Sequence, residues 1–466
     1  MRQVTGTLRA SLPFLPVAAG LFCIQLDFFS LGLALPTIAA ELGSTVTNLQ
    51  WLISGYMIAL GAFLIPSGRL GDVLGRRDVL LSGIAVFGLS SLVCGLVTSA
   101  HLLIAARVVQ GLGAALIMPA SFALVTNATS ERERPGVTGV LMGVAGVGTA
   151  LGPVVGGVFS ATIGWRWVFL INVPVAAVAI WRGWRLQTSR DESADRDLRR
   201  LDWWGVVTVA GGLTALSIAV DDVGAEGWTN PVTVGPLLGG IALLVAFVLR
   251  ERRAAQPLVR PSLVRNRVFV VLCVAGTLAN IGTVVYVVAA TIDLQTLRGL
   301  TPTAAGLAFV VSSIGLAACG PLSGWLTTKV PAGLIMAVAV LACGPALVLL
   351  ALAGPLWVYV LALGFCGLTT GMGYGLGQVA VQNVLPPERS AEGTGVMLTS
   401  LICVGGFGVV AGTAVIESVG AAPPTTTGLA VTLVGLAVLL LLAGVVTLVS
   451  QWPRTRTSVA PAPAPA

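Results

Sequence analysis

Apolar runs separated by short polar segments follow one another along nearly the whole chain. A helix needs about 20 apolar residues to cross the hydrocarbon core of a bilayer, and fourteen runs approach or exceed this length. The pattern therefore predicts an all-α polytopic membrane protein, with helices at 13–37, 48–67, 78–99, 102–126, 136–159, 166–183, 203–220, 231–249, 268–291, 303–326, 331–353, 356–381, 393–417 and 428–450.

The basic residues indicate how these helices are oriented. An even number of spans puts both ends of the chain on one side of the membrane. Of the 26 Lys and Arg residues, only Arg107, Arg166 and Arg298 fall outside the segments on that side. Cytoplasmic loops of membrane proteins are enriched in Lys and Arg. We therefore expect a multi-pass protein of the cytoplasmic membrane with both termini in the cytoplasm. This topology bias, and not nucleic acid, then explains the net charge of +7. The lipid bilayer is the expected partner.

The composition agrees with a membrane protein. Hydrophobic residues make up 56% of the chain and charged residues 10%, whereas a soluble protein has about 25% charged residues. These values exclude a water-soluble globule, and they exclude intrinsic disorder, which requires low hydrophobicity. The seven cysteines lie in apolar runs without CxxC spacing, and His101 is the single histidine, so we expect no metal site and no disulfide framework. The first apolar run is too long for a signal peptide, and we interpret it as the first span.

Two short segments recur in the two halves of the chain. GRLGDVLGRR covers Gly68–Arg77, and the similar GPLSGWLTTK covers Gly320–Lys329. A Glu-Arg pair also precedes a glycine-rich run in both halves, at 133–134 and at 388–389. Parallel repeats of this kind are typical of transporters. The expected units are six-helix bundles over 13–183 and 268–450, two inserted helices with basic inner loops over 184–267, and a disordered tail over 451–466.

Asp27 is the only acidic residue near the middle of a predicted span. An uncompensated charge there costs a few kcal/mol, so such a carboxylate faces a water-filled path or a partner. We expect Asp27 to bind and release protons in turn; the alternative is a buried acid permanently paired with a base. Helix geometry puts Arg107 within reach of Asp27, where it would control the charge of the carboxylate. Arg107 could instead extend outward or bind backbone carbonyls.

The run 136–159 has a glycine at every fourth position, Gly148, Gly152 and Gly156, beside Pro153 and Gly157. Such a stripe lets another helix approach backbone to backbone. A proline inside a helix removes a hydrogen bond and favours a kink. Tight helix packing is one role for this stripe, and a dry seal on one side of a cavity is the functional alternative.

The segment 68–77 combines glycines with charged residues, namely Gly68, Asp72, Gly75, Arg76 and Arg77. We expect a tight inner loop, because glycine permits the turn. The charges would pair across this loop or with another helix end; a merely solvated loop is the alternative.

Polar and aromatic side chains within the spans are candidates to line a pathway. They are Gln25, Phe28, Phe29, Tyr56, Asn280, Tyr286, Tyr374, Gln378 and Gln382. Helix packing explains each of them individually, but together they indicate a large, mostly apolar cavity suited to amphipathic ligands. The sequence contains no Walker A motif and no catalytic triad, so we expect neither an enzyme nor a pump driven directly by ATP.

Taken together, five segments resemble the major facilitator superfamily, and specifically its fourteen-helix drug–proton antiporter branch. They are GRLGDVLGRR (68–77), LIAARVVQGLGAA (103–115, with Arg107, Gln110, Gly111 and Gly113), the glycine–proline run (148–157), GWRWVFLINVP (164–174) and LQTLRGLTPTAAGL (294–307). The first helix departs from the branch. Asp27 and the Ala-Leu-Pro at 34–36 match, but Phe29 and Gly32 replace a threonine and an asparagine.

The resemblance implies alternating access between two bundles, driven by protons and without a cofactor. It implies that Asp27 and Arg107 couple proton movement, that Asp72 and Arg76 belong to an inner gate, and that helix 136–159 packs against the other bundle. We expect export of amphipathic drugs, antibiotics or a self-made metabolite by a protein that functions as a monomer. The alternatives are a proton symporter that imports a small nutrient and a sensor without transport activity. A second proton site stays open among Asp293, Glu417 and Asp222.

Overall fold

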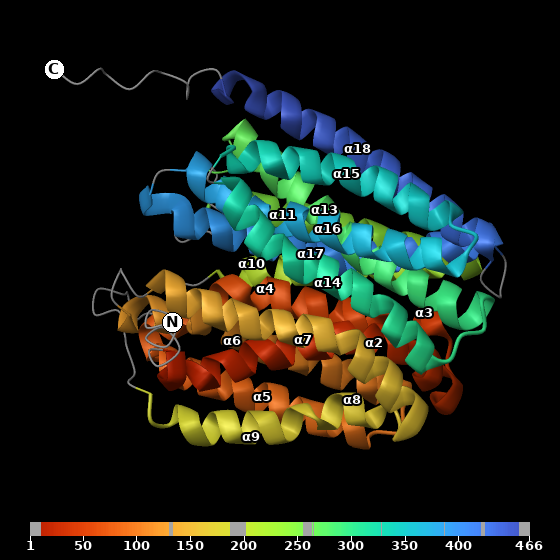
Figure 1. The fold of residues 1–466 in the computed structure, drawn as a ribbon, viewed down its shortest axis with the longest axis horizontal. Coiled ribbons are helices and arrows are strands. Elements are labelled where there is room, and N and C mark those ends of the chain that lie inside the picture. Colours follow the sequence, from red (N-terminus) through yellow and green to blue (C-terminus); the bar gives the residue numbers. More distant parts are fainter. Residues whose placement is uncertain are drawn as a thin grey trace.

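The computed structural model describes residues 11–129, 134–186, 202–254, 263, 265–327, 329–385, 387–420 and 425–455. Throughout these residues the regular structure is helical. The long helices form two groups that lie side by side, with the N-terminal half of the chain in one group and the C-terminal half in the other (Figure 1). The all-α polytopic architecture predicted from the apolar runs is confirmed.

Every predicted span corresponds to a helix or to a pair of helices. The helices are α2 (Leu15–Leu42), α4 (Trp51–Leu74), α5 (Arg76–Leu96), α6 (Ala100–Ala128), α7 (Arg134–Thr162), the pair α8 (Arg166–Leu170) and α9 (Asn172–Gly183), α10 (Trp203–Glu226), α11 (Pro231–Glu251), α13 (Arg267–Ile292), α14 (Pro302–Thr327), α15 (Ala332–Leu352), α16 (Leu356–Val384), α17 (Pro387–Gly420) and α18 (Thr426–Thr455). Short connecting segments are η1 (Leu12–Phe14), α3 (Val46–Leu49) and the π-helix η3 (Asp293–Leu297).

Within the described residues, 12 helical spans are long and apolar enough to cross a membrane, judged by length and composition. The α8–α9 pair is outside this set because it breaks at Ile171 into two short helices, and α14 contributes Pro302–Leu316 as a shorter apolar helix. Both still pack within the helix groups, α9 against α2 and α5, and α14 against α16. They therefore belong to the same architecture as the longer spans.

The two groups of helices are bundles with their own internal packing. In the N-terminal bundle, α2 packs against α7, and α6 packs against both α4 and α5. In the C-terminal bundle, α16 packs against α14 and α15, and α15 also packs against α18. The inserted helices α10 and α11 pack against each other, and α10 contacts both α4 and α17, where the bundles meet. The residue limits of the expected domains stay a prediction.

The bundles meet along two helix pairs, α4 with α17 and α7 with α14. Glycines allow these backbones to approach. A Cβ atom added at Gly61 of α4 would lie 2.7 Å from the backbone nitrogen of Cys403 in α17. One added at Gly306 of α14 would lie 2.7 Å from the carbonyl oxygen of Pro153 in α7. Close packing of small residues holds helices together in lipid, where no hydrophobic force acts between them.

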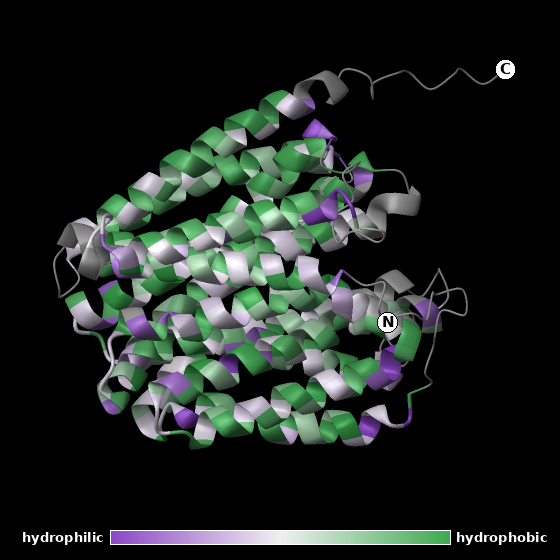
Figure 2. Ribbon diagram, turned by 180° about the vertical axis from the view of Figure 1, so that it is seen from behind, coloured by the Kyte–Doolittle hydropathy of each residue, from purple (hydrophilic) through white to green (hydrophobic). Residues whose placement is uncertain are grey.

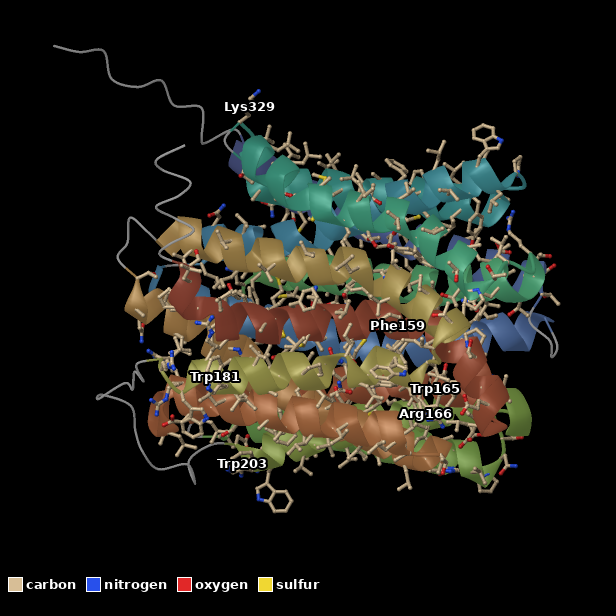
Figure 3. The ribbon with its side chains drawn as sticks, turned by 60° about the horizontal axis from the view of Figure 1, so that its bottom comes forward. Phe159, Trp165, Arg166, Trp181, Trp203 and Lys329 are labelled. Carbon is tan, nitrogen blue, oxygen red and sulfur yellow. The ribbon has the colours of Figure 1, made fainter. Side chains whose placement is uncertain are left out.

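Hydrophilic residues concentrate at the two ends of the molecule, and the flanks are mainly apolar (Figure 2). One end of the molecule, called the arginine-rich end below, carries Arg76, Arg77, Arg182 and Arg250. The other end, called the opposite end below, carries Glu41, Arg166 and Arg298. Trp181, Trp203 and Lys329 lie toward the first end, and Trp165 and Arg166 lie toward the second (Figure 3). Several tryptophans near the ends are exposed, namely Trp167, Trp181, Trp184, Trp204, Trp228 and Trp357. Exposed tryptophans at both ends suit the two interfaces of a bilayer.

The prediction of a tight loop over 68–77 is wrong. Helix α4 continues through Leu74, and α5 begins at Arg76, so Gly75 alone separates them. Gly75 has φ +110, a conformation that side chains with a Cβ rarely adopt. The apolar pattern ends at about residue 67 because the helix reaches the edge of the apolar layer. The backbone hydrogen bonds of α4 continue for two more turns beyond that point, because charged and polar residues can also adopt the helical conformation.

Candidate functional site

A buried ion pair joins α2 to α6 near the middle of the N-terminal bundle. Arg107 Nη1 lies 2.5 Å from Asp27 Oδ2, and both side chains are 0% exposed. Two charges lose several kcal/mol each when they leave water, and only close pairing with further hydrogen bonds compensates this loss. The structure therefore brings together the two residues that the sequence singled out.

Amide side chains from α6 and α9 complete the surroundings of the carboxylate. Gln110 and Asn172 both donate to Asp27 Oδ1, at 3.1 and 3.2 Å. Gln110 also donates to Ser91 Oγ at 2.7 Å and accepts from Arg107 Nη1 at 2.6 Å. Four elements, α2, α5, α6 and α9, thus contribute to one polar cluster in an apolar bundle.

Arg107 has contacts of its own that do not depend on Asp27. Its Nε donates to the carbonyl oxygen of Leu52 at 2.9 Å, and its guanidinium lies 4.4 Å from the centre of the Tyr56 ring. A second ring, that of Phe169, lies 5.7 Å away. Arg107 Nη2 is buried and has no hydrogen-bond partner among the described residues. The arginine thus has alternative partners when the carboxylate changes charge, and rings nearby that stabilise a cation.

Asn172 and Ser91 were missed by sequence reasoning, and Gln110 was quoted only as part of a motif. The one available signal for Asn172 was an amide inside the apolar run 166–183. Its importance depends on the rotation of α9, which turns this side chain toward α2 and α5. Ser91 gives still less signal, because a serine in a span usually bonds to its own helix.

A cavity of about 330 Å³ lies where helices of the two bundles come together. Of the predicted lining residues, it contacts Gln25, Phe28, Phe29, Tyr56 and Asn280. Other contacts are Met57, Met118, Thr149, Thr283, Leu316, Cys319, Gly375, Leu401 and Ile402. Tyr286 lies elsewhere, buried in the C-terminal bundle with its hydroxyl 2.8 Å from Ser312 Oγ. The side chains of Tyr374, Gln378 and Gln382 lie outside the described residues.

The few polar groups of this cavity are amides and hydroxyls that retain capacity to accept hydrogen bonds. The amide nitrogen of Gln25 donates to Thr149 Oγ1, and that of Asn280 donates to the carbonyl of Leu401, both at 3.0 Å. The corresponding amide oxygens keep accepting capacity. The buried Tyr56 hydroxyl has no partner within the part of the chain that the structure describes, and it can donate or accept. The described side chains around the cavity include no charged group.

Asp27 does not line the cavity, although its neighbours Gln25 and Phe28 do. On a helix, residues two positions apart point in different directions. The carboxylate therefore faces the interior of its own bundle. Tyr56 joins the two sites, because its ring covers Arg107 and the same residue lines the cavity.

The glycine stripe of α7 contacts α2 of the same bundle. A Cβ atom at Gly148 would lie 2.7 Å from the carbonyl oxygen of Phe22, and one at Gly156 would overlap the carbonyl of Ser30. The other bundle is reached from the adjacent positions. A Cβ atom at Gly157 would overlap the carbonyl of Pro302 at the start of α14. The motif thus serves two packing interfaces.

At the arginine-rich end, Arg77 donates to Asp78 Oδ1 at 2.8 Å and to the carbonyl of Leu186 at 3.2 Å. The side chain of Asp72 lies outside the described residues. Gly68 faces α6, with an added Cβ atom 3.8 Å from Pro119. The structure therefore shows Arg77 tying α5 to the end of α9.

The acids considered as second proton sites have different positions. Asp293 is largely buried and pairs with Arg298, with 2.6 Å between Oδ2 and Nε. Asp222 is partly exposed near the end of α10, and the side chain of Glu417 lies outside the described residues. Among the residues that the structure describes, no group of three or more His, Cys, Asp or Glu side chains could hold a metal ion.

Comparison with known proteins gives consistent similarities. A family model described as Major Facilitator Superfamily matches residues 17–292 and again residues 272–466. The chain is similar to the puromycin resistance protein pur8 of Streptomyces alboniger, 36% identical over 65% of this chain and 59% of that protein. It is equally similar to the cephamycin export protein CmcT of Amycolatopsis lactamdurans, 36% identical over 68% of this chain and 65% of that protein. These matches span less than two thirds of the length of either relative.

Solved structures share the fold. A crystal structure of the peptide transporter POT in complex with sulfate superimposes with a TM-score of 0.70, covering 95% of this chain and 94% of that chain. The two sequences are 14% identical. The likeness therefore concerns the arrangement of helices alone.

Proposed function

The chain belongs to the Major Facilitator Superfamily, and on this premise we propose that it exports amphipathic drugs, antibiotics or a self-made metabolite across the cytoplasmic membrane in exchange for protons. The two bundles would rock about the central cavity and open it to each side in turn. Two relatives are a resistance protein and an export protein, which supports export of antibiotic-like compounds.

The observation that carries proton coupling is the fully buried pair of Asp27 and Arg107. Binding of a proton to Asp27 removes the negative charge that holds Arg107. The guanidinium then relies on the Leu52 carbonyl and Gln110 Oε1, which it already contacts. Because Tyr56 packs on Arg107 and lines the cavity, a shift of the arginine changes the shape of the substrate site. This gives substrate and proton a physical connection without direct contact.

The membrane potential makes this exchange productive. One charge that moves through 100 mV releases about 2.3 kcal/mol, which supports a roughly fiftyfold gradient of a neutral substrate. A monovalent cation exchanged for one proton gains nothing from the voltage. The proposal therefore favours neutral substrates, or cations driven by the pH gradient.

The cavity indicates which compounds fit. Its apolar and aromatic walls, including the edge-to-face pair Phe28 and Phe29 with ring centres 5.2 Å apart, suit an amphipathic molecule. The free amide oxygens of Gln25 and Asn280 suit hydroxyl, amide or ammonium donors. The volume of about 330 Å³ is that of a drug-sized ligand.

We propose that both termini lie in the cytoplasm, so that the arginine-rich end faces it, and that the protein works as a monomer in the lipid bilayer. The enrichment of arginine in Arg76, Arg77, Arg182 and Arg250 supports this orientation. Cysteine labelling of intact cells at Asn48, which is exposed near the opposite end, tests it. A membrane-impermeant maleimide should label Asn48→Cys but not a cysteine placed at Arg185.

The first test measures proton movement in everted membrane vesicles with an acidic lumen and a pH-sensitive dye. Addition of a substrate to the bath should release protons from vesicles containing the native protein and restore dye fluorescence. Asp27→Asn keeps the shape and loses the proton site, so it should abolish the response. Glu41→Gln, which removes a half-exposed carboxylate at the far end of the same helix, is the matched control and should respond normally.

Two results would contradict the proposal. If Asp27→Asn responds like the native protein, Asp27 does not couple protons. If a transported compound moves protons into the lumen with it, the protein is a symporter, because substrate and proton then travel in the same direction.

A further inference from the structure

The connection between α13 and α14 has a conformation that the transport site does not explain. Residues Asp293–Leu297 form the π-helix η3, and Gly299 follows with φ +66. Single turns of π-helix are rare and are frequently found at functional sites. The segment lies at the opposite end of the molecule, between the last turn of α13 and the start of α14.

This π-helix directs Gln295 across the boundary between the bundles. Gln295 Nε2 donates to the carbonyl oxygen of Leu33 in α2, at 3.0 Å. Leu33 lies beside an interruption of the α2 ladder, because Pro36 has no N–H to donate to the neighbouring Gly32 carbonyl. The same helix holds Asp27, six residues earlier. The bond therefore connects the C-terminal bundle to the helix that carries the buried carboxylate.

An ion pair and backbone contacts hold the π-helix in place. Arg298 Nε lies 2.6 Å from Asp293 Oδ2. The two terminal nitrogens of Arg298 donate to the carbonyls of Gly354 and Ala353, at 2.8 and 2.7 Å. Its guanidinium also lies 4.5 Å from the centre of the Tyr359 ring. Arg298 thus ties both ends of η3 to the connection between α15 and α16.

The same segment continues into the other inter-bundle contact at this end. Pro302 and Gly306, at the start of α14, meet Pro153 and Gly157 of α7 so closely that a Cβ atom at either glycine would overlap the facing backbone. Residues 293–306 therefore contact both α2 and α7 of the N-terminal bundle. Opening of the cavity toward this end requires all of these contacts to separate.

We propose that Gln295 is a latch that closes the opposite end of the transporter, and that the Asp293–Arg298 pair is a positioning device that aims Gln295 at α2. The inference rests on the proposed alternating access. The latch favours the state recorded in the structure and must release when the cavity opens to the other side. Asp293 acts through Gln295 and does not itself touch substrate.

The test measures the distance between the bundles directly. Nitroxide labels at Asn48→Cys on α3 and Trp357→Cys on α16 report on the opposite end, since both residues are exposed. The partly buried Cys273 and Cys319 are replaced by Ser in this background. Gln295→Met keeps the size of the side chain and removes the donor. It should increase the population with the longer distance about two- to tenfold, the effect of one lost hydrogen bond.

Thr296→Ala is the matched control, because Thr296 is an exposed neighbour in the same π-helix. It should leave the distance distribution unchanged. If Gln295→Met is poorly folded, Gln295→Glu keeps a polar side chain but loses the amide donor, and it should give the same shift. A distribution identical to the native one in a folded Gln295 variant overturns the latch.

A double-mutant cycle separates positioning from general stability. Asp293→Asn should shift the distribution in the same direction as Gln295→Met, and it should add nothing once Gln295 has been replaced. If the two shifts multiply, Asp293 acts independently and the positioning role is overturned.

These distances are measured without substrate or a proton gradient. If the Gln295 variants shift the label distances as expected but no compound moves protons in the vesicle assay, the proposed export is rejected and the latch is not. If substrate moves protons in the vesicle assay but the Gln295 variants leave the label distances unchanged, the latch alone is rejected.

Discussion

Both bundles contain an ion pair between aspartate and arginine, but the pairs differ in burial and in the groups that bind them. Asp27 and Arg107 are 0% exposed and lie among side-chain amides. Asp293 and Arg298 are 12% and 25% exposed, lie at the opposite end, and hold backbone carbonyls. A cavity of about 250 Å³ adjoins the second pair. The buried pair of Asp27 and Arg107 is thus suited to a change of charge. The more exposed pair of Asp293 and Arg298 is suited to fixing the connection between α13 and α14.

The largest effect is expected when one partner of the deeper pair is removed. Arg107→Met leaves the Asp27 carboxylate buried without its cation, which costs about 3–5 kcal/mol. Arg298→Met, on the partly exposed pair, should cost only about 1 kcal/mol. Thermal unfolding of the purified proteins in detergent gives this ranking. Equal losses would mean that burial does not distinguish the pairs.

Removal of both charges provides the control for this comparison. Asp27→Asn combined with Arg107→Met should recover much of the stability lost by Arg107→Met alone, because no unpaired charge remains. It should not recover proton movement in the vesicle assay. If the double variant recovered both stability and proton movement, the ion pair would not be part of the coupling mechanism.

A smaller effect is expected from the two packing interfaces of α7. Gly156→Ala forces the Ser30 backbone away within one bundle, so it should lower stability by about 1–3 kcal/mol. Gly157→Ala meets the Pro302 backbone of the other bundle, so it should instead favour separation at the opposite end. Gly143→Ala is the control, because an added Cβ atom there has nothing within 4 Å. Unfolding and the label distances distinguish the outcomes, and identical behaviour of the two variants would contradict separate interfaces.

The smallest effect is expected at the cavity. Asn280→Leu removes an acceptor, so KM for a substrate with hydroxyl or amide donors should rise roughly two- to tenfold. A transported compound with neither donors nor acceptors should keep its KM, and it serves as the internal control. An equal rise for both compounds would show that Asn280 shapes the cavity without selecting donors.

Much of the fold could be predicted because its signals are local. The span 231–249 corresponds to α11 at Pro231–Glu251, with Asn230 capping its first turn through a hydrogen bond to the Val232 N–H. The segment 68–77 was predicted wrongly, because hydropathy marks where the apolar layer ends and not where the helix ends. The break between α8 and α9 at Ile171 also gave no hydropathy signal.

The candidate site divides in the same way. Asp27 and Arg107 could be found because a charge in an apolar run is conspicuous, and helix geometry put them within reach. The cage of Ser91, Gln110 and Asn172 could not be derived, because it depends on how three helices are rotated. Nor could the sequence reveal that Asp27 faces away from the cavity.

Length, apolar periodicity and the distribution of arginine were enough to predict a helical membrane protein with one conspicuous buried carboxylate. These properties act on each segment alone, through the thickness of the apolar layer and the cost of a bare charge within it. Only the packed structure decided that Asn172 and Gln110 bind that carboxylate and that Gln295 crosses to Leu33. Such contacts join residues far apart in the chain. They form only when several helices have the right rotation about their axes and the right position along them.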